Sequence, residues 1–237
     1  MKHIIAIASG KGGVGKSTVA TNIACALATE GRQIGLLDLD IYGPSLPIVL
    51  GINEQPKMTQ GNKLVPLEKF GLKIMSFGFI SGNDTPVIWR GPLVSRMTEQ
   101  FFRDVDWGEL DILILDLPPG TGDIQLTLTQ KLRMTGAVIV TTPQDIALAD
   151  VRKGADMFRK VNTPVLGVVE NMSGLTIEGK TNPDNTILQI NGEEISIDSE
   201  GNFRISLDLF KTGGGEKESE RLGVPLLGKI PISETIM

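Results

Sequence analysis

The fold is decided by one stretch, residues 4–18, which reads IIAIASGKGGVGKST. Its apolar start, Ile4–Ala8, predicts a buried strand that leads directly into a glycine-rich turn and then into a helix. Closely spaced glycines allow backbone amides to curve around an anion, and the N-terminus of the following helix adds a partial positive charge. The spacing G-x-x-x-x-G-K-[ST] therefore predicts a phosphate-binding loop.

This loop supplies most of the predicted nucleotide contacts. Lys16 is expected to reach the β- and γ-phosphates, and the Ser17 hydroxyl is expected to ligate Mg²⁺. The residues assigned to nucleotide binding on this ground are Gly10, Lys11, Gly12, Gly13, Val14, Gly15, Lys16, Ser17 and Thr18.

Lys11 stands out, because an ordinary phosphate loop needs no cation immediately after its first glycine. Phosphoryl transfer needs positive charge near the leaving phosphate, and a lysine this early in the loop would turn back onto its own nucleotide only with difficulty. Donation across a two-fold interface is the simpler geometry, so we expect a homodimer in which Lys11 is catalytic. The alternative is a lysine that faces solvent.

Composition limits the class of protein. The chain has 237 residues, 41% of them hydrophobic and 22% charged, which predicts one α/β domain spanning 1–237. The formal net charge of −5 and the lack of a Lys/Arg run argue against nucleic acid as a partner. We find no apolar stretch of membrane-spanning length and no signal-peptide pattern, and Cys25 is a lone cysteine. We therefore expect a cytoplasmic protein that does not bind membranes.

Apolar strands alternate with amphipathic helices along the chain, which predicts a doubly wound, mostly parallel sheet flanked by helices. The expected strands are Ile4–Ala8, Ile34–Leu37, Leu72–Phe77, Ile112–Leu115, Ala137–Thr141, Val165–Val169 and Pro225–Ile230. The expected helices are Ser17–Glu30, Val94–Val105, Ile124–Arg133 and Ala147–Val161. Two stretches interrupt the alternation: Asn53–Lys69 is interpreted as a surface excursion or hairpin, and Thr176–Leu209 as a β-rich insertion.

Carboxylates follow two of these strands directly. Asp38 and Asp40 are spaced by one residue, so both are expected to point to the same side at the strand end. We assign Asp38 to Mg²⁺ through its hydration shell and Asp40 to the attacking water. Asp116 has the position of a Walker B carboxylate that binds the metal and takes part in catalysis, and Gly120 can give its amide to the γ-phosphate. Ligands of such sheets bind at the carboxyl ends of the strands, so these groups should converge there.

Longer motifs resemble a known family. The phosphate loop is similar to that of the deviant Walker A, or MinD/ParA-type, ATPases. The stretches 38–47, 89–92, 105–111, 116–123, 213–216 and 222–231 resemble the Mrp/ApbC branch of iron–sulfur cluster carriers. The resemblance implies ATP with Mg²⁺ as ligands, Lys11 reaching the partner's nucleotide, and Asn171 contacting adenine. It also implies two switch loops, Tyr42–Pro47 and Gly120–Gln125.

One feature of that branch is missing here. Carriers have a Cys-x-x-Cys pair shortly after the Asn-Met-Ser element, where one cluster is bridged between two subunits. This chain has no cysteine in that region, and Cys25, flanked by Ala24 and Ala26, is expected to be a packing thiol. An iron–sulfur cluster bound by the family's route is therefore not expected.

Three functions remain open from the sequence. The first is an ATP-hydrolysing dimeric switch in iron–sulfur cluster or metallocofactor assembly, with a client apoprotein or cluster-assembly proteins as partners. The second is a nucleotide-gated adaptor with little turnover, which docks a partner through its 176–209 insertion. The third, a positioning ATPase on membrane or DNA, is disfavoured because no basic run or amphipathic basic tail is present.

Overall fold

The computed structural model describes residues 1–41, 43–81, 91–182, 187–190, 192–209 and 213–233. Tyr42 of the first expected switch loop lies outside these ranges, as do Trp89 and Arg90 of one motif.

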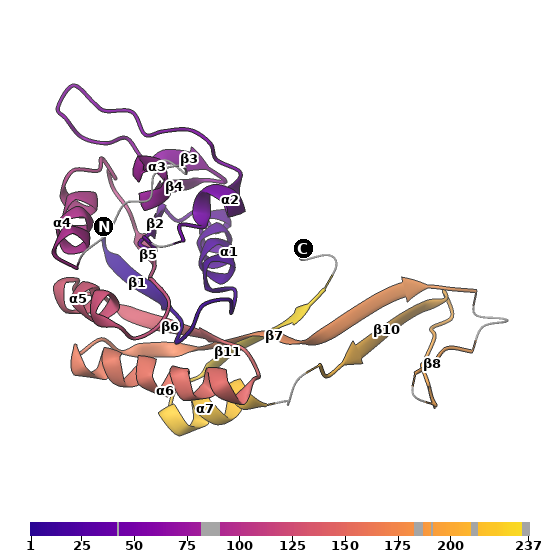
Figure 1. Ribbon diagram of the computed structural model, residues 1–237. Coiled ribbons are helices and arrows are strands. Elements are labelled where there is room, and N and C mark those ends of the chain that lie inside the picture. The colour runs from indigo at the N-terminus through magenta and orange to yellow at the C-terminus, as the bar shows by residue number, and fades with distance from the viewer. Residues whose placement is uncertain (42, 82–90, 183–186, 191, 210–212, 234–237) are drawn as a thin grey trace.

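The centre of the molecule is a largely parallel sheet in the order β10-β7-β6-β1-β5-β2-β4-β3, with β11 paired to β7 (Figure 1). Its strands are β1 (His3–Ala8), β2 (Ile34–Asp38), β3 (Leu67–Lys69), β4 (Leu72–Ser76), β5 (Ile112–Asp116), β6 (Gly136–Thr141), β7 (Val165–Lys180), β10 (Asn202–Leu207) and β11 (Leu226–Ile232). Every residue of β2 and β6 is buried, because the helices cover both faces of a parallel sheet. The doubly wound fold predicted from the alternation of strands and helices is confirmed.

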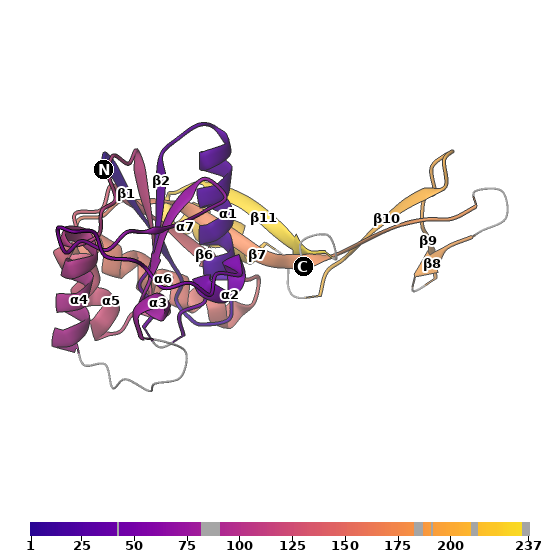
Figure 2. The ribbon, with the colours of Figure 1, turned by 90° about the horizontal axis from the view of Figure 1, so that it is seen from above.

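Helices cover both faces of this sheet. Parallel strands are joined by right-handed crossovers. A helix whose crossover leads toward one end of the sheet therefore lies on the opposite face from a helix whose crossover leads toward the other end. Figures 1 and 2 show α1 on one face and α4 and α5 on the other, with α6 and α7 packed together. The helices are α1 (Lys16–Thr29), α2 (Leu46–Leu50), α3 (Phe77–Ser81), α4 (Gly91–Arg103), α5 (Asp123–Lys131), α6 (Asp145–Lys160) and α7 (Gly214–Leu222).

The core between sheet and helices is apolar and tightly closed. Phe77 and Phe101 meet edge to face with ring centroids 4.9 Å apart, and both are almost completely buried. Trp107 is also buried and donates its indole N–H to the Phe101 carbonyl at 2.9 Å. None of the described helices combines the length and apolar character that a bilayer crossing requires.

The hairpin expected at Asn53–Lys69 is confirmed. Met58 and Leu64 form an antiparallel bridge, and β3 then pairs antiparallel with β4 at the edge of the sheet.

β7 is much longer than its apolar stretch predicts. The strand was expected to end at Val169, but it continues to Lys180, so Asn171 and the rest of the Asn-Met-Ser element lie inside a strand rather than after one. The reason is pairing: β11 accompanies β7 as far as Leu175, and β10 then runs antiparallel along its outer half. Together with β8 (Gln189–Ile190) and β9 (Glu193–Glu194), this outer half forms an arm that projects from the body (Figures 1 and 2). The β-rich insertion expected at 176–209 is this arm.

Candidate nucleotide-binding site

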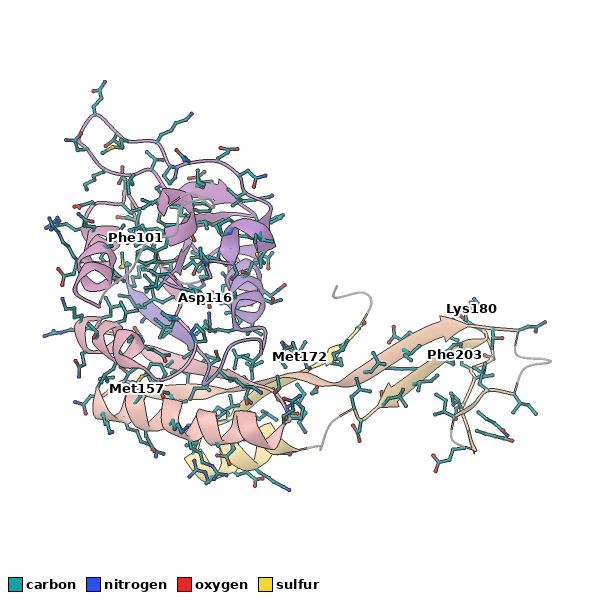
Figure 3. The ribbon with its side chains drawn as sticks, viewed as in Figure 1. Phe101, Asp116, Met157, Met172, Lys180 and Phe203 are labelled. Carbon is teal, nitrogen blue, oxygen red and sulfur yellow. The ribbon has the colours of Figure 1, made fainter. Side chains whose placement is uncertain are left out.

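The site is assembled by three adjacent strands. In the register of the sheet, Asp116 of β5 lies beside Ile7 of β1 on one side and beside Asp38 of β2 on the other. The phosphate loop and the two carboxylates therefore leave the sheet at the same edge, as expected for parallel strands. Figure 3 shows Asp116 in the interior of the body, close to the strand ends.

The phosphate loop has the backbone that its glycines predict. Gly13 and Gly15 both have φ of 79°, a left-handed conformation that residues with a Cβ rarely adopt. Gly15 is the N-cap of α1 and provides no side-chain hydrogen bond. The first amides of that helix, which have no partner within the helix, therefore stay available at the loop. The Ser9 hydroxyl donates to the Lys11 carbonyl at 2.9 Å and fixes the start of the turn.

Lys16 and Asp116 form a buried ion pair at the centre of the site. Lys16 Nζ lies 2.5 Å from Asp116 Oδ1 and 3.3 Å from the Ser17 hydroxyl, and both charged side chains are almost fully buried. Burial raises the pKa of Asp116, whereas the Lys16 ammonium and the Ser17 hydroxyl oppose that rise. Asp116 Oδ2 is buried and has no hydrogen-bond partner among the described residues. Such an oxygen is an available ligand.

The Asp38 carboxylate accepts hydrogen bonds from the backbone that follows it in the chain. Its Oδ1 accepts from the Asp40 amide at 2.9 Å, while its Oδ2 accepts from the Leu46 amide at 3.3 Å and from the Ser76 hydroxyl at 3.0 Å. Burial and the nearby Asp116 charge raise the pKa of Asp38 to about 7. With both oxygens engaged, Asp38 can influence a metal through water but presents no free oxygen for direct ligation.

Asp40 lies two residues beyond the end of β2, and its charge, like that of Asp38, acts on Asp116. The backbone turns there because the Asp40 amide donates to the Asp38 carboxylate. Asp40 Oδ1 accepts from the Gly43 amide at 3.2 Å, and its charge contributes to the raised pKa of Asp116. It remains partly exposed beside the buried pair, where a water molecule could reach it.

The Gly120 amide does not point to an open phosphate position in this structure. It donates to the Ser9 carbonyl at 2.9 Å, so the loop after β5 is tied to the phosphate loop. Gly120 has φ of 93°, and a Cβ there would lie 3.9 Å from the Gly10 carbonyl oxygen. Delivery of this amide to a phosphate requires the Ser9 hydrogen bond to break first.

Two other predicted residues lie around the loop. Asn171 donates its side-chain amide to the Val14 carbonyl at 2.9 Å, and a Cβ at Gly15 would come within 2.2 Å of the same nitrogen. Lys11 donates to the side chain of Gln144, the residue that precedes α6, at 3.2 Å. Asn171 thus contacts the phosphate loop from β7, whereas Lys11 connects that loop to the start of α6.

Sequence reasoning missed two buried groups that support the site. Ser76 bridges the Asp38 carboxylate and the Gly78 amide, 3.0 Å from each. Glu170, which precedes Asn171, accepts from the Gly215 amide at 2.5 Å and thereby joins β7 to the start of α7. A Cβ at Gly215 would lie 2.8 Å from the Glu170 carboxylate, so this close contact favours glycine. The run of glycines at 213–215 was the signal in the sequence that could have indicated the contact.

The donors present fit a magnesium ion better than a cluster. Asp116 Oδ2 and the Ser17 hydroxyl are hard oxygen donors beside a phosphate loop, which is the ligand type that Mg²⁺ prefers. Among the residues that the structure describes, no group of three or more His, Cys, Asp or Glu could hold a metal alone. Cys25 is partly buried on α1, and burial raises the pKa of its thiol, which is the reverse of a thiolate ligand. The cysteine content therefore does not fit a bound iron–sulfur cluster.

A phosphate loop between a buried strand and a helix, with its lysine paired to the carboxylate of a neighbouring strand, defines a P-loop NTPase. Residues 1–209 match the ParA family profile described as NUBPL iron-transfer P-loop NTPase. The chain belongs to this family, and the resemblance to the Mrp/ApbC branch is confirmed.

The relatives include proteins named iron–sulfur cluster carrier protein. The one from Pseudomonas fragi is 48% identical over 238 residues, covering 100% of this chain and 75% of that protein. The one from Aquifex aeolicus is 57% identical over 175 residues, covering 73% of this chain and 48% of that protein. This chain thus spans between about half and three quarters of the length of these two relatives.

Solved structures agree on the fold. A nucleotide-binding protein from Archaeoglobus fulgidus, solved in complex with ADP, is 35% identical and superimposes with a TM-score of 0.76, covering 99% of this chain and 83% of its own. The cell division ATPase MinD of Pyrococcus furiosus, at 22% identity and a TM-score of 0.61, covers 98% of this chain and 84% of its own. The second likeness concerns the fold alone.

Proposed function

We propose that this chain is an ATP-hydrolysing switch that acts as a dimer in the assembly of iron–sulfur clusters or related metallocofactors. The observation that carries the proposal is the buried Lys16–Asp116 pair, with its unpartnered carboxylate oxygen, at the mouth of a glycine-rich loop. A buried ion pair contributes little net stability, so its placement against a phosphate loop points to ligand binding rather than to structure.

Each predicted residue has a part in this function. Lys16 exchanges Asp116 for the β- and γ-phosphates when nucleotide binds, and the released carboxylate and the Ser17 hydroxyl hold Mg²⁺. The metal supplies charge neutralisation at the transferring phosphoryl group. Asn171, already against the loop, contacts the adenine edge through its amide.

The two loops that follow β2 and β5 act as switches. Asp40 orients the attacking water, and Asp38 holds Asp40 by its backbone while it contacts the metal through water. Release of the Gly120 amide from Ser9 couples the second loop to the γ-phosphate.

Lys11 acts on the nucleotide of a second copy. Its ammonium contacts the neutral Gln144 side chain, a contact that it can exchange for a phosphate of the second copy. In that position it neutralises charge on the partner's γ-phosphate.

The client is inferred from the family. Relatives named iron–sulfur cluster carrier protein support a role in cluster assembly, with a client apoprotein or assembly proteins as partners. The formal net charge of −5 and the lack of a Lys/Arg run are the grounds for proposing a cytoplasmic protein that binds neither nucleic acid nor membrane. Because Cys25 is the one cysteine, cluster transfer by this chain would need thiolates from the client. Anaerobic reconstitution with iron and sulfide should then leave no stoichiometric cluster on the isolated chain.

Two lysine variants test the nucleotide site. Lys16→Ala should abolish binding of magnesium–ATP in calorimetry, whereas Lys11→Ala should bind normally and lose hydrolysis. Equal loss of binding in both variants would contradict the role across the dimer.

The rate of ATP turnover distinguishes an enzyme from a nucleotide-gated adaptor. We expect Asp40→Ala to reduce phosphate release by at least tenfold while ATP binding is kept. A wild-type rate no higher than that of Asp40→Ala would favour a nucleotide-gated adaptor instead.

A further inference from the structure

In the part of the chain that the structure describes, the arm has a strand edge without a partner. Leu175 of β7 pairs with Ile232 of β11 and with Leu207 of β10, so these two strands lie on opposite edges of β7. β10 continues along its edge to Lys180, whereas β11 ends at Ile232. Among the described residues, nothing pairs with the β11 side of β7 beyond Leu175. In Figure 3, Met172 lies at the base of the arm and Lys180 near its far end.

The backbone groups on this open edge can be assigned. The Thr181 amide donates to the Gly201 carbonyl at 2.8 Å, so residue 181 faces β10. Because successive residues of a strand present their N–H and C=O groups to alternate edges, Thr176, Glu178 and Lys180 face the other way. These three residues offer a row of donors and acceptors with the spacing of a strand.

Edge strands are usually blocked, because unpaired N–H and C=O groups recruit another chain. Here the two-stranded ribbon is exposed, with Ile177 showing 40% of its surface. The Glu178 carboxylate forms an ion pair at 3.5 Å with Arg204 of the paired strand β10. No proline interrupts 175–182, so no residue of this stretch lacks a backbone N–H. The edge therefore has the properties of a pairing template.

The charge of the arm limits what can pair with it. Residues 175–209 contain seven acidic and two basic side chains, a net charge of −5 that equals the formal net charge of the whole chain. The remaining residues are balanced. A concentrated negative field on a projecting element attracts positively charged segments and repels acidic ones.

We propose that the edge Thr176–Lys180 accepts an extended, basic segment of a partner protein, which adds to the arm as a further strand. Main-chain hydrogen bonds supply affinity in this mode, and the acidic side chains select the sequence. The edge begins five residues after Asn171, which contacts the phosphate loop, so β7 connects the proposed docking edge to the nucleotide site. The proposal does not depend on ATP hydrolysis.

The test uses a fluorescein-labelled peptide of about eight residues that alternates Lys and Val, with a Glu–Val peptide of equal length as its control. Anisotropy should show that the full chain binds the basic peptide in nucleotide-free buffer and does not bind the acidic one. Thr176→Pro removes one outward N–H, which the ribbon does not use, and should weaken binding at least tenfold. Thr176→Ala keeps that N–H and should bind within twofold of the wild type. Circular dichroism verifies that both variants remain folded.

Charge is tested separately. Glu193→Lys together with Glu194→Lys, both exposed on the arm, should weaken binding at least fivefold, whereas Glu220→Lys on α7 should not. Equal binding of both peptides, or binding unaffected by Thr176→Pro, would overturn the proposal. So would a dimer in sedimentation that Thr176→Pro converts to a monomer, because the edge would then be occupied by a second copy. An inactive ATPase site would leave each of these results unchanged.

Discussion

Replacement of Lys16 by methionine should destabilise the protein strongly in nucleotide-free buffer. Lys16 is 6% exposed and Asp116 is 0% exposed, with 2.5 Å between ammonium and carboxylate. Removing one partner of a buried ion pair leaves an uncompensated buried charge, which costs about 3–5 kcal/mol of unfolding free energy. We expect a loss of this size for Lys16→Met at pH 8.

The loss should depend on pH. Burial already raises the pKa of Asp116 above its ordinary value of 3.8, and Lys16 opposes this rise, so the pKa should climb further in Lys16→Met. A carboxyl group with a folded pKa above its unfolded pKa destabilises the folded state as pH rises between the two values. The deficit of the variant should therefore be largest at pH 8 and should shrink toward pH 5.

A double-mutant cycle isolates the cause. Lys16→Met combined with Asp116→Asn removes both charges, and its unfolding free energy should return to within about 2 kcal/mol of the wild type. Urea denaturation followed by circular dichroism gives the four free energies, without nucleotide because a ligand would stabilise only the variants that bind it. The reasoning is refuted if Lys16→Met costs less than about 1 kcal/mol at pH 8, or if its cost is the same at pH 5.

Three further predictions follow from single contacts. Gly215→Ala places a Cβ 2.8 Å from the Glu170 carboxylate and should cost about 1–3 kcal/mol in urea denaturation, whereas Gly228→Ala, with no atom within 4 Å of its Cβ, should cost less than about 0.5 kcal/mol. Asp38, with a folded pKa of about 7, should make unfolding free energy fall by up to about 1.4 kcal/mol per unit as pH rises from 5 to 7, and Asp38→Asn should flatten that slope. Asn171→Ala loses the hydrogen bond to Val14, which should cost about 1 kcal/mol, and under the proposed function it should reduce the preference for ATP over GTP in competition binding.

The sequence determined the parts of this protein that depend on local conformation. The glycines of the phosphate loop need left-handed backbone at Gly13 and Gly15, and no other residue type adopts it as readily. The buried strands and amphipathic helices repeat in an order that permits little besides a doubly wound sheet. The loop, the fold class and the convergence of Asp38 and Asp116 at one sheet edge were therefore predictable.

Only the tertiary structure decided which groups contact each other across long separations. The pairing of Lys16 with Asp116, 100 residues apart, and the capture of Asp38 by Ser76 depend on strand order and register. The length of β7 depends on β10 and β11, since a strand extends as far as its neighbours accept its hydrogen bonds. The edge of the arm that the described residues leave unpaired has the same origin: the described pairing of β11 reaches Leu175, and no local pattern in β7 records where another strand ends.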